Sequence, residues 1–388
     1  MSPASSSIPK VLVVTPLYPP AYRGGGPIRT TEALVETHGD KFDFFVITSD
    51  TDWGESSPLD VETDHWVQQR KAQVTYTQAR KFQSLLRAYW AGIRLEPDFL
   101  YINSFLSPTF SIIPVALSRL GLFGKATVIL APRGEFGTAA LALKSRKKRA
   151  FLLGSRISGL HRKVVWHASS EIEANDIRRS KPNAQVEIRL NESNLPMTAL
   201  RSSRPEDGVV RLVFISRISE IKGVKLLLEA LSSVTQTVEM HLYGSAQNPS
   251  YLEECRELAA RLPENIKVSF KGAVENSLVR SLFADADAFF LPTEQENFGH
   301  AIAESLSAGC PVFIEDVTPW TATVRNGGGE IVPERTAQRW GLALNYYCGL
   351  SHADRMKMKD RAADAYEQWR ANHEGPSVFE LVKSTSSR

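Results

Sequence analysis

Short apolar runs alternate with longer amphipathic segments along most of this chain, and the alternation occurs twice. In the first half, five runs contain almost no charged residue: 11–15, 44–48, 99–103, 126–131 and 164–168. Such runs are typical of strands buried on both faces, as in parallel sheets. Because parallel strands must be joined by crossovers, the amphipathic segments between them are expected to be helices that cover the sheet.

The alternation stops at residues 196–208, a segment rich in proline, serine and charge, and then starts again. The second half contains five further runs: 210–216, 240–244, 267–272, 287–291 and 311–314. A chain of 388 residues is long enough for two domains with well-filled cores. The sequence therefore predicts two doubly wound α/β domains with a cleft between them.

Cysteine usage and hydropathy bear on the compartment. Cys255, Cys310 and Cys348 have no regular spacing, which argues against a disulfide framework or a zinc site and favours a reducing compartment. The start, MSPASSSIPK, lacks the apolar core of a signal peptide, and no apolar run approaches the roughly 20 residues of a membrane span. We expect a cytoplasmic protein, resting at most on the inner face of the cell membrane.

The segment 291–313 carries the most informative polar residues. A buried-type strand ends at Pro292, and a loop with Glu294, Glu296 and Asn297 leads to a helix from about Gly299 that carries Glu304. Open α/β sheets bind ligands where strands end and helices begin, and the N–H groups at Phe298 and Gly299 would face an anion there. A phosphate pocket flanked by carboxylates is predicted, the alternative being a solvated loop with surface acids.

Two cations follow the first strand of the second half. Arg217 comes directly after that strand, and Lys222 with Gly223 opens the next helix. A helix N-terminus disfavours Lys unless an anion is bound, and Arg with Lys together suit a diphosphate. The alternative is a pair of ordinary surface charges.

The loop after the first strand contains three consecutive glycines, 24–26. Glycine allows a ligand to approach the backbone closely, although a plain flexible loop explains the run equally well. A dinucleotide-binding fingerprint needs its glycines directly after the strand, whereas eight residues, PLYPPAYR, intervene here. This spacing disfavours an NAD-dependent oxidoreductase.

Residues 116–165 hold 11 basic residues and one acid, Glu135. The turn after the fourth strand, Pro132-Arg133-Gly134, is expected to aim Arg133 and Glu135 at the cleft. An anionic membrane surface or a phosphorylated lipid acceptor would suit the segment, and nucleic acid is disfavoured because stacking aromatics are missing. A solvated basic face is the alternative. The acceptor or membrane residues are Arg133, Glu135, Lys144, Arg146, Lys147, Lys148 and Arg149.

The two glutamates of Glu296-x7-Glu304, with Phe298-Gly299 between them, resemble the signature of retaining glycosyltransferases of family 4. Arg217 with Lys222-Gly223 is similar to that family's donor-phosphate motif, and the stretches APRGEF, HASSEIEA, VSFKG and TPW also look familial. The chain is most similar to the bacterial branch that builds surface polysaccharides. The resemblance implies the α/β GT-B fold, with two Rossmann-like domains facing a central cleft.

The resemblance further implies a division of labour. Residues 1–200, with a returning helix at about 368–388, would form the acceptor side, and residues 208–367 would bind the nucleotide sugar. Arg217 and Lys222 would hold the diphosphate, Glu296 the sugar hydroxyls and Glu304 the ribose. The implied donor-binding residues are Gly25, Gly26, Arg217, Lys222, Gly272, Glu296, Asn297, Phe298, Gly299 and Glu304. The implied catalytic residues are Glu296, Arg217, Lys222 and Arg133.

One residue departs from the family pattern. Many relatives carry His in the turn that reads Pro132-Arg133-Gly134 in this chain, and Arg cannot act as a base at neutral pH. Retaining members are thought to let the leaving phosphate accept the proton, so this departure affects the mechanism little. No cofactor is expected, and no metal, because no metal-binding motif is present.

The function predicted is transfer of a sugar from a nucleotide-diphosphate donor, a UDP- or GDP-sugar, to a lipid-linked or surface-polysaccharide saccharide. The first alternative is a nucleotide-sugar 2-epimerase of the same fold, which would consume the donor without an acceptor. The second is a non-catalytic module that binds nucleotide or anionic lipid.

Overall fold

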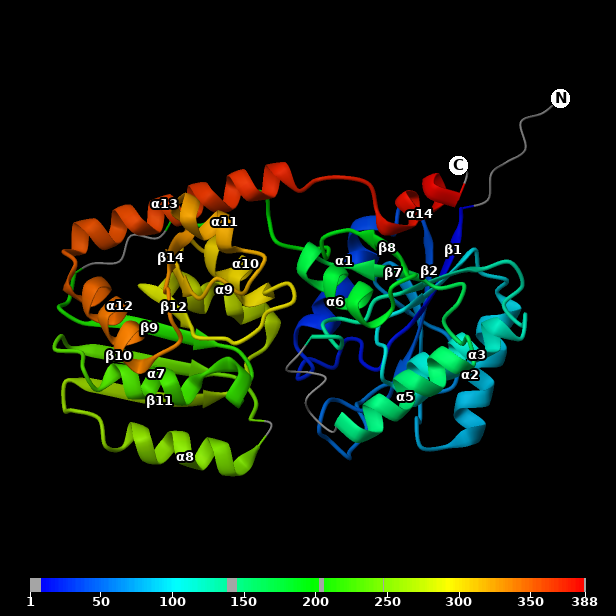
Figure 1. Ribbon diagram of the computed structural model, residues 1–388, viewed down its shortest axis with the longest axis horizontal. Coiled ribbons are helices and arrows are strands. Elements are labelled where there is room, and N and C mark those ends of the chain that lie inside the picture. Colours follow the sequence, from blue (N-terminus) through cyan, green and yellow to red (C-terminus); the bar gives the residue numbers. More distant parts are fainter. Residues whose placement is uncertain (1–7, 138–144, 202–205, 247, 387–388) are drawn as a thin grey trace. The chain divides into compact units, whose positions relative to one another are not determined.

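A computed structural model describes residues 8–137, 145–201, 206–246 and 248–386, with the side chains of 145–150 and 386 left out (Figure 1). The chain divides into two compact units. The first comprises Met1–Asn194 and Gly375–Arg388, and the second comprises Leu195–Glu374. Among the described residues, no helix combines the length and the apolar composition needed to cross a membrane.

The first unit is built on an eight-stranded sheet in the order β3-β4-β2-β1-β5-β6-β7-β8. Every described pairing is parallel except that of β3 with β4. The chain winds outward from β1 in one direction and then from β5 in the other, so the switch point lies between these two strands. The strands are β1 (Lys10–Val14), β2 (Asp43–Ser49), β3 (Val67–Gln69), β4 (Ala72–Thr77), β5 (Phe99–Ile102), β6 (Thr127–Leu130), β7 (Val165–Ala168) and β8 (Gln185–Ile188).

Helices connect most of these strands, as the sequence pattern predicts, but within the described residues 43–77 none lies between β2, β3 and β4. A π-helical turn, Pro108–Ile112, leads directly into α3. The helix between β6 and β7 is described only from Ser145. The helices are α1 (Gly26–His38), α2 (Phe82–Arg94), α3 (Ile113–Arg119), α5 (Ser145–Ile157) and α6 (Glu171–Ser180).

The second unit contains a parallel six-stranded sheet in the order β11-β10-β9-β12-β13-β14. Its switch point lies between β9 and β12. The strands are β9 (Val210–Ile215), β10 (Val238–Tyr243), β11 (Ile266–Gly272), β12 (Ala288–Leu291), β13 (Val312–Ile314) and β14 (Gly329–Ile331). The helices are α7 (Val224–Leu231), α8 (Pro249–Ala259), α9 (Asn276–Asp285), α10 (His300–Ser307), α11 (Thr321–Thr323), α12 (Ala337–Gly349) and α13 (His352–Asn372).

The last helix, α14 (Val378–Ser386), packs on the first unit although it follows α13 of the second. Its Phe379 is fully buried in the core of the first unit. The return begins at Gly375 rather than near residue 368, because α13 continues to Asn372 within the second unit. Phe379 makes ring contacts with Phe42, Phe44, Phe99 and Tyr101.

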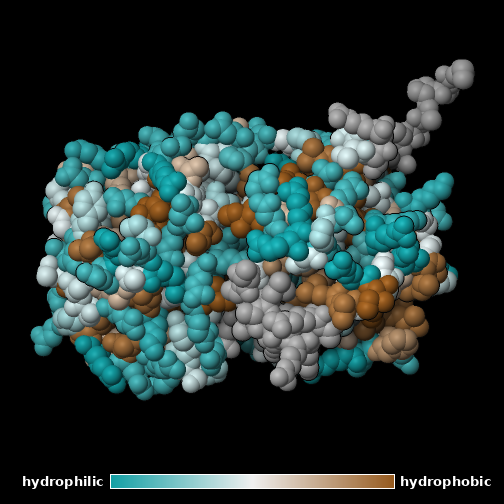
Figure 2. Space-filling model, viewed as in Figure 1, coloured by the Kyte–Doolittle hydropathy of each residue, from teal (hydrophilic) through white to brown (hydrophobic). Residues whose placement is uncertain are grey.

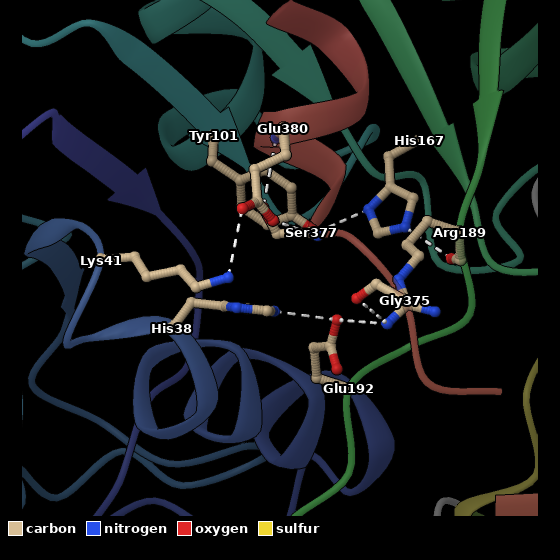
Figure 3. Close-up of polar contacts among 9 residues, drawn as sticks. All are labelled: His38, Lys41, Tyr101, His167, Arg189, Glu192, Gly375, Ser377 and Glu380. Carbon is tan, nitrogen blue, oxygen red and sulfur yellow. Dashed lines mark hydrogen bonds and ion pairs between the residues drawn. The ribbon is translucent and has the colours of Figure 1, made fainter. Parts of the chain in front are cut away.

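Polar contacts fix the start of this returning segment (Figure 3). The Ser377 amide donates to the Glu380 carboxylate at 2.7 Å, and the Glu380 amide donates to the Ser377 hydroxyl at 3.2 Å. This reciprocal pair is a capping box, which satisfies two helix N–H groups. Lys41 lies 3.2 Å from Glu380, and Arg189 donates to the carbonyl of Gly375 at 3.3 Å.

Candidate functional site

The loops that follow β9 and β12 meet at the switch point of the second sheet. The amide of Glu294, in the loop after β12, donates to the carbonyl of Ile221, in the loop after β9, at 2.8 Å. Lys222 Nζ lies 2.6 Å from Glu296 Oε2. The carboxyl edge at a switch point is where open α/β sheets bind ligands, so the ion pair stands in the expected place.

Lys222 is buried, with 6% of its surface exposed. Besides Glu296, its ammonium donates to the carbonyl of Gln295 and the hydroxyl of Thr293, each at 3.4 Å. An ammonium has three donors, and all three point at the loop after β12. Glu296 is more open, with 18% of its side chain exposed. The pair therefore holds a charged ammonium at the edge of the sheet while the carboxylate keeps access to solvent.

Glycine allows these two loops to lie in contact. Gly223 has a φ of 70°, and a Cβ at this position would lie 2.2 Å from the carbonyl oxygen of Pro292. Gly244, after β10, has a φ of 146°, and its Cβ would lie 1.8 Å from the carbonyl oxygen of Ser216. Both positions are closed to other residues by the backbone conformation and by direct clash. The close contact with Pro292 therefore explains why glycine follows Lys222.

The loop after β12 continues into α10 through Gly299, whose φ is 83°. Phe298 is buried, and its carbonyl accepts a hydrogen bond from Trp320 Nε1 at 2.5 Å. Glu304 is 8% exposed on α10, and His300 contacts the ring of Phe298. The first N–H groups of a helix have no partner within it, so the start of α10 is suited to an anion. Asn297, half-buried, belongs to the same turn.

Arg335 braces both loops, and the sequence analysis did not identify it. Its guanidinium donates to the carbonyl of Pro292 at 3.3 Å and lies 3.1 Å from Glu294. It also reaches the carbonyl of Glu220 at 3.4 Å and the carboxylate of Glu315 at 3.8 Å. Glu294 is therefore engaged in holding the loop. The sequence feature that could have identified Arg335 is its position shortly after β14, which places it at the carboxyl edge of the same sheet.

Arg217 follows β9, and Gly272 ends β11, which β10 separates from β9. Arg217 is exposed, and its charge interacts with that of Glu296. The surrounding protein still desolvates part of the side chain, which lowers the pKa of Arg217, whereas the charge of Glu296 raises it; a guanidinium stays protonated in either case. The carbonyl of Gly272 accepts from the amide of Gly244 at 2.7 Å. A Cβ on Gly272 would meet no atom within 4 Å, so its φ of 75° alone favours glycine there.

In the first unit, the glycine loop is fixed by Asp52. The Asp52 carboxylate accepts from the amides of Tyr22 and Arg23, at 3.0 and 3.2 Å. Gly25 has a φ of 71° and caps α1, which begins at Gly26. A Cβ on Gly25 would have no neighbour within 4 Å, so the backbone there is open. The loop is ordered by its contacts and leaves the N-terminus of α1 accessible.

Arg133 belongs to a polar network at the ends of several strands. Its guanidinium donates to Asn103 Oδ1 at 2.5 Å, to Tyr101 OH at 2.6 Å, and to Asn191 Oδ1. Asn103 in turn donates to the hydroxyl of Thr31 on α1 at 2.7 Å. From the sequence, Arg133 was expected to face a cleft. In the structure its guanidinium instead contacts side chains within the first unit. Arg133 is therefore placed to hold the loops of the first switch point in position.

Glu135 is likewise used within the first unit. Its carboxylate accepts from the amides of Phe105 and Leu106, at 2.8 and 2.6 Å, and from the hydroxyl of Ser104 at 3.1 Å. It orders the loop after β5. Lys144 lies outside the described residues, and the side chains at 146–149 are likewise outside the description, although their backbone belongs to α5.

His167 extends the polar network and stays neutral (Figure 3). Its ring nitrogens lie 2.9 Å from Tyr101 OH and 2.8 Å from the carbonyl of Arg189. Burial, with a smaller contribution from the charges of Arg133 and Arg189, lowers the pKa of His167 to about 3. Glu192, between Arg189 at 3.3 Å and His38 at 3.1 Å, joins this network to α1. Sequence reasoning missed His167 because it lies inside an apolar run.

Comparison with known proteins shows which families and folds the chain is similar to. Residues 198–364 match the family model described as glycosyl transferases group 1. An uncharacterized glycosyltransferase of Methanocaldococcus jannaschii is 29% identical over 120 residues, which cover 30% of each chain. Glycogen synthase of Haemophilus influenzae is 29% identical over 133 residues, covering 34% of this chain and 27% of the synthase. This chain thus spans less than a third of the length of either relative.

The whole chain also matches a solved structure. The Anabaena protein HepE, in complex with UDP-glucose, superimposes with a TM-score of 0.70 over 98% of this chain and 100% of that one, at 15% identity. At this identity the likeness concerns the fold, which is GT-B with two Rossmann-like units. The predicted fold class is confirmed.

Proposed function

We propose that this chain, of which residues 198–364 match the glycosyl transferases group 1 model, is a retaining glycosyltransferase. It would move a hexose from a nucleotide-diphosphate donor to a saccharide acceptor that is lipid-linked or part of a surface polysaccharide. The observation that carries the proposal is the Lys222–Glu296 ion pair at the switch point of the second sheet. A buried cation and a partly open carboxylate at one strand edge suit a ligand with both phosphate and hydroxyl groups.

The proposed roles follow from charge and exposure. Lys222 and Arg217 stabilise the departing diphosphate, which gains charge as the glycosidic bond breaks. Before the donor binds, Glu296 keeps the Lys222 ammonium in place, so little reorganisation is needed. The carboxylate of Glu296 then accepts hydrogen bonds from hydroxyl groups of the donor sugar, and the carboxylate of Glu304 accepts hydrogen bonds from those of the ribose.

Backbone groups complete the proposed donor site. The N–H groups of Asn297, Phe298 and Gly299 lie at the start of α10, where anions are favoured. Gly272, at the carboxyl end of β11 in the same sheet, is a further proposed donor contact. Gly25 and Gly26 stay predicted donor contacts on the first unit. Arg133 is assigned to positioning, because its guanidinium already donates to three side chains. The leaving phosphate, rather than a protein side chain, accepts the proton of the acceptor.

The donor is proposed to be a UDP- or GDP-sugar. A UDP-glucose complex of a protein with the same fold supports the UDP arm. A thermal-shift screen of UDP-, GDP- and ADP-sugars tests this choice, because a ligand that binds only the folded state raises its apparent stability. If none of the three nucleotide sugars raises the melting temperature, the proposed donor class is contradicted.

Turnover measurements test the site. We expect Lys222→Ala and Glu296→Ala each to lower turnover by roughly 10²-fold or more, as loss of a charge-stabilising group does. Lys225→Ala is the matched control, because Lys225 lies three residues further on, in α7, but its side chain is 46% exposed and paired with Glu254 at the surface. Near-normal turnover in either site variant would refute the assignment.

Product analysis separates the alternatives. An epimerase converts the donor with no acceptor present, whereas a binding module leaves it intact even when acceptor is added. A transferase forms a glycosylated product only with both. Activity is expected to survive EDTA; its loss and recovery with Mg²⁺ would contradict a metal-independent reaction.

The proposed acceptor also implies where in the cell the protein acts. A lipid-linked acceptor would be met at an anionic membrane surface from the cytoplasmic side. The 11 basic residues within 116–165 support this partner, including those at 144–149. No nucleic acid is proposed as a partner.

A further inference from the structure

Helix α2 exposes a stripe of three large apolar side chains. Phe82, Leu86 and Trp90 are 76%, 58% and 55% exposed. They are spaced four residues apart, which places them one above another on a single face of the helix. Three such residues in register on an outer face are unusual for a soluble surface, where exposed apolar side chains are normally scattered.

The stripe is not needed to attach α2 to its sheet. The opposite face carries Ser84, Ala88, Tyr89 and Gly92, all of them buried. A Cβ on Gly92 would lie 2.8 Å from Leu12 of β1, so the helix already lies close against the sheet. The outer stripe therefore remains available to a partner outside the unit.

The turn after α3 extends the apolar surface. Leu120 is 75% exposed and Leu122 is 45% exposed. Leu122 lines the same hollow as Ile93 of α2, so the turn borders the C-terminal end of the stripe. Figure 2 shows hydrophobic side chains gathered on this part of the first unit. We call Phe82, Leu86, Trp90, Leu120 and Leu122 together the α2 face.

Basic residues outnumber acids around the α2 face. Arg94 lies over the ring of Trp90 at 5.1 Å, and α2 itself contains no Asp or Glu. Two acids, Glu96 and Asp98, follow α2. The carboxylate of Asp98 accepts a hydrogen bond from the backbone amide of Lys10 at 2.8 Å. Arg87, on α2 itself, is exposed and lies 3.4 Å from Asp64. The other exposed basic residues around the face are Arg80, Lys81, Arg94, Arg119 and Lys125.

We infer that the α2 face is a docking surface for an anionic lipid bilayer. Phe82, Leu86 and Trp90 insert at the boundary between headgroups and acyl chains, where Trp is favoured and apolar burial stabilises binding. The surrounding Arg and Lys side chains contact lipid phosphates. This inference deepens the membrane part of the proposed function and assigns the contact to α2 rather than to residues 144–149.

Charge favours a bilayer over a second copy of the chain. A two-fold symmetric dimer through this face would bring the basic residues of one copy against the same residues of the other. Like charges opposed across an interface are unfavourable, whereas an anionic surface neutralises them. The aromatic residues beside basic ones have the composition of membrane-surface helices.

Vesicle sedimentation tests the proposal with the full chain. Vesicles of phosphatidylcholine alone and with about one-third phosphatidylglycerol are compared at roughly 0.1 M salt, where charge attraction still acts near the surface. The variant Phe82→Ser/Leu86→Ser/Trp90→Ser is expected to bind anionic vesicles at least tenfold more weakly. The matched control is Leu278→Ser/Leu342→Ser/Tyr346→Ser, whose residues are 52%, 56% and 52% exposed in the second unit. The control is expected to bind within twofold of the unchanged chain.

The contribution of charge has its own variant. Arg80→Gln/Lys81→Gln/Arg94→Gln should remove the preference for anionic over neutral vesicles. Arg256→Gln/Arg261→Gln/Lys267→Gln, which changes three exposed basic residues of the second unit, should preserve it. An equal loss in both variants would mean attraction by overall charge and would overturn the docking face.

Trp90 provides a direct readout of insertion. With brominated lipid in anionic vesicles, fluorescence of the chain should be quenched, and Trp90→Phe should lose most of that quenching. Equal quenching in Trp90→Phe, or tight vesicle binding by the triple Ser variant, would overturn the inference. The inference would also be overturned if the unchanged chain formed a dimer that the triple Ser variant does not form, and if neither protein bound vesicles. Donor binding in the thermal-shift screen is read separately, so failure here leaves the proposed transfer reaction standing.

Discussion

Replacing Glu296 by Gln removes the charge that faces Lys222 while keeping the size of the side chain. The Lys222 side chain is 8% exposed and the Glu296 side chain is 18% exposed, so the pair is largely shielded from water. Removing one partner of such a pair leaves an uncompensated buried charge. We therefore expect Glu296→Gln to destabilise the second unit.

The size of the effect follows from the remaining contacts. Breaking a fully buried ion pair costs about 3–5 kcal/mol. Lys222 keeps the Gln295 carbonyl and the Thr293 hydroxyl, so a smaller loss of about 2 kcal/mol is expected for Glu296→Gln. Lys222→Met leaves the more exposed partner alone and should cost about 1 kcal/mol. The double variant should be no less stable than Lys222→Met, which gives a coupling free energy of about 2 kcal/mol.

Urea unfolding of the four proteins measures this cycle. A loss of 2 kcal/mol lowers the melting temperature of a unit this size by about 4–8 °C. Because the chain has two units, intrinsic fluorescence and thermal melting are followed together to assign the transition to the second unit. A nucleotide diphosphate should raise the melting temperature of Glu296→Gln more than that of the unchanged chain, because its phosphate replaces the missing charge. A coupling near zero would refute the ion pair as described.

Three further perturbations test other parts of the structure. Gly223→Ala should destabilise the second unit by more than 2 kcal/mol and abolish donor binding, because its Cβ would clash with Pro292; Gly208→Ala, with a similar φ of 77° but open surroundings, should cost only about 1 kcal/mol in urea unfolding. Phe379→Ala should cost the first unit about 3–5 kcal/mol, whereas Phe82→Ala on the surface should cost under about 0.5 kcal/mol, and equal losses would contradict the docking of α14. Burial lowers the pKa of His161 to about 3, so the unfolded chain binds its proton first and stability is lost as pH falls from about 6.5 toward 3. His161→Phe should therefore stabilise the first unit by up to about 2 kcal/mol more at pH 5 than at pH 8, and a gain independent of pH would contradict this account.

Local patterns were sufficient for the buried strands but not for the edges of the sheets. The apolar runs at 11–15 and 210–216 correspond to β1 and β9, because both faces of a central parallel strand are covered. The antiparallel β3–β4 pair, β8 and β14 were not predicted. Their sequences mix polar and apolar residues, as strands at or near a sheet edge do, so no continuous apolar run marks them.

The candidate site shows the same division. The glycines at 223 and 299 and the acids at 296 and 304 stand out in the sequence, because spacing after a strand determines which residues reach its carboxyl edge. The partners of these residues could not be predicted. Arg335 braces the loop after β12 from 43 residues further along the chain, and the guanidinium of Arg133 is held by Asn191, 58 residues away.

By itself the sequence determined two wound sheets and the residues that lie at their strand ends. Only the tertiary structure decided which of those residues meet. Lys222 and Glu296 are 74 positions apart and form an ion pair because β12 pairs directly with β9, whereas β10 and β11 lie on the other side. Hydropathy records whether a strand is buried; the order of strands depends on how helices and crossovers pack together, which no local pattern contains.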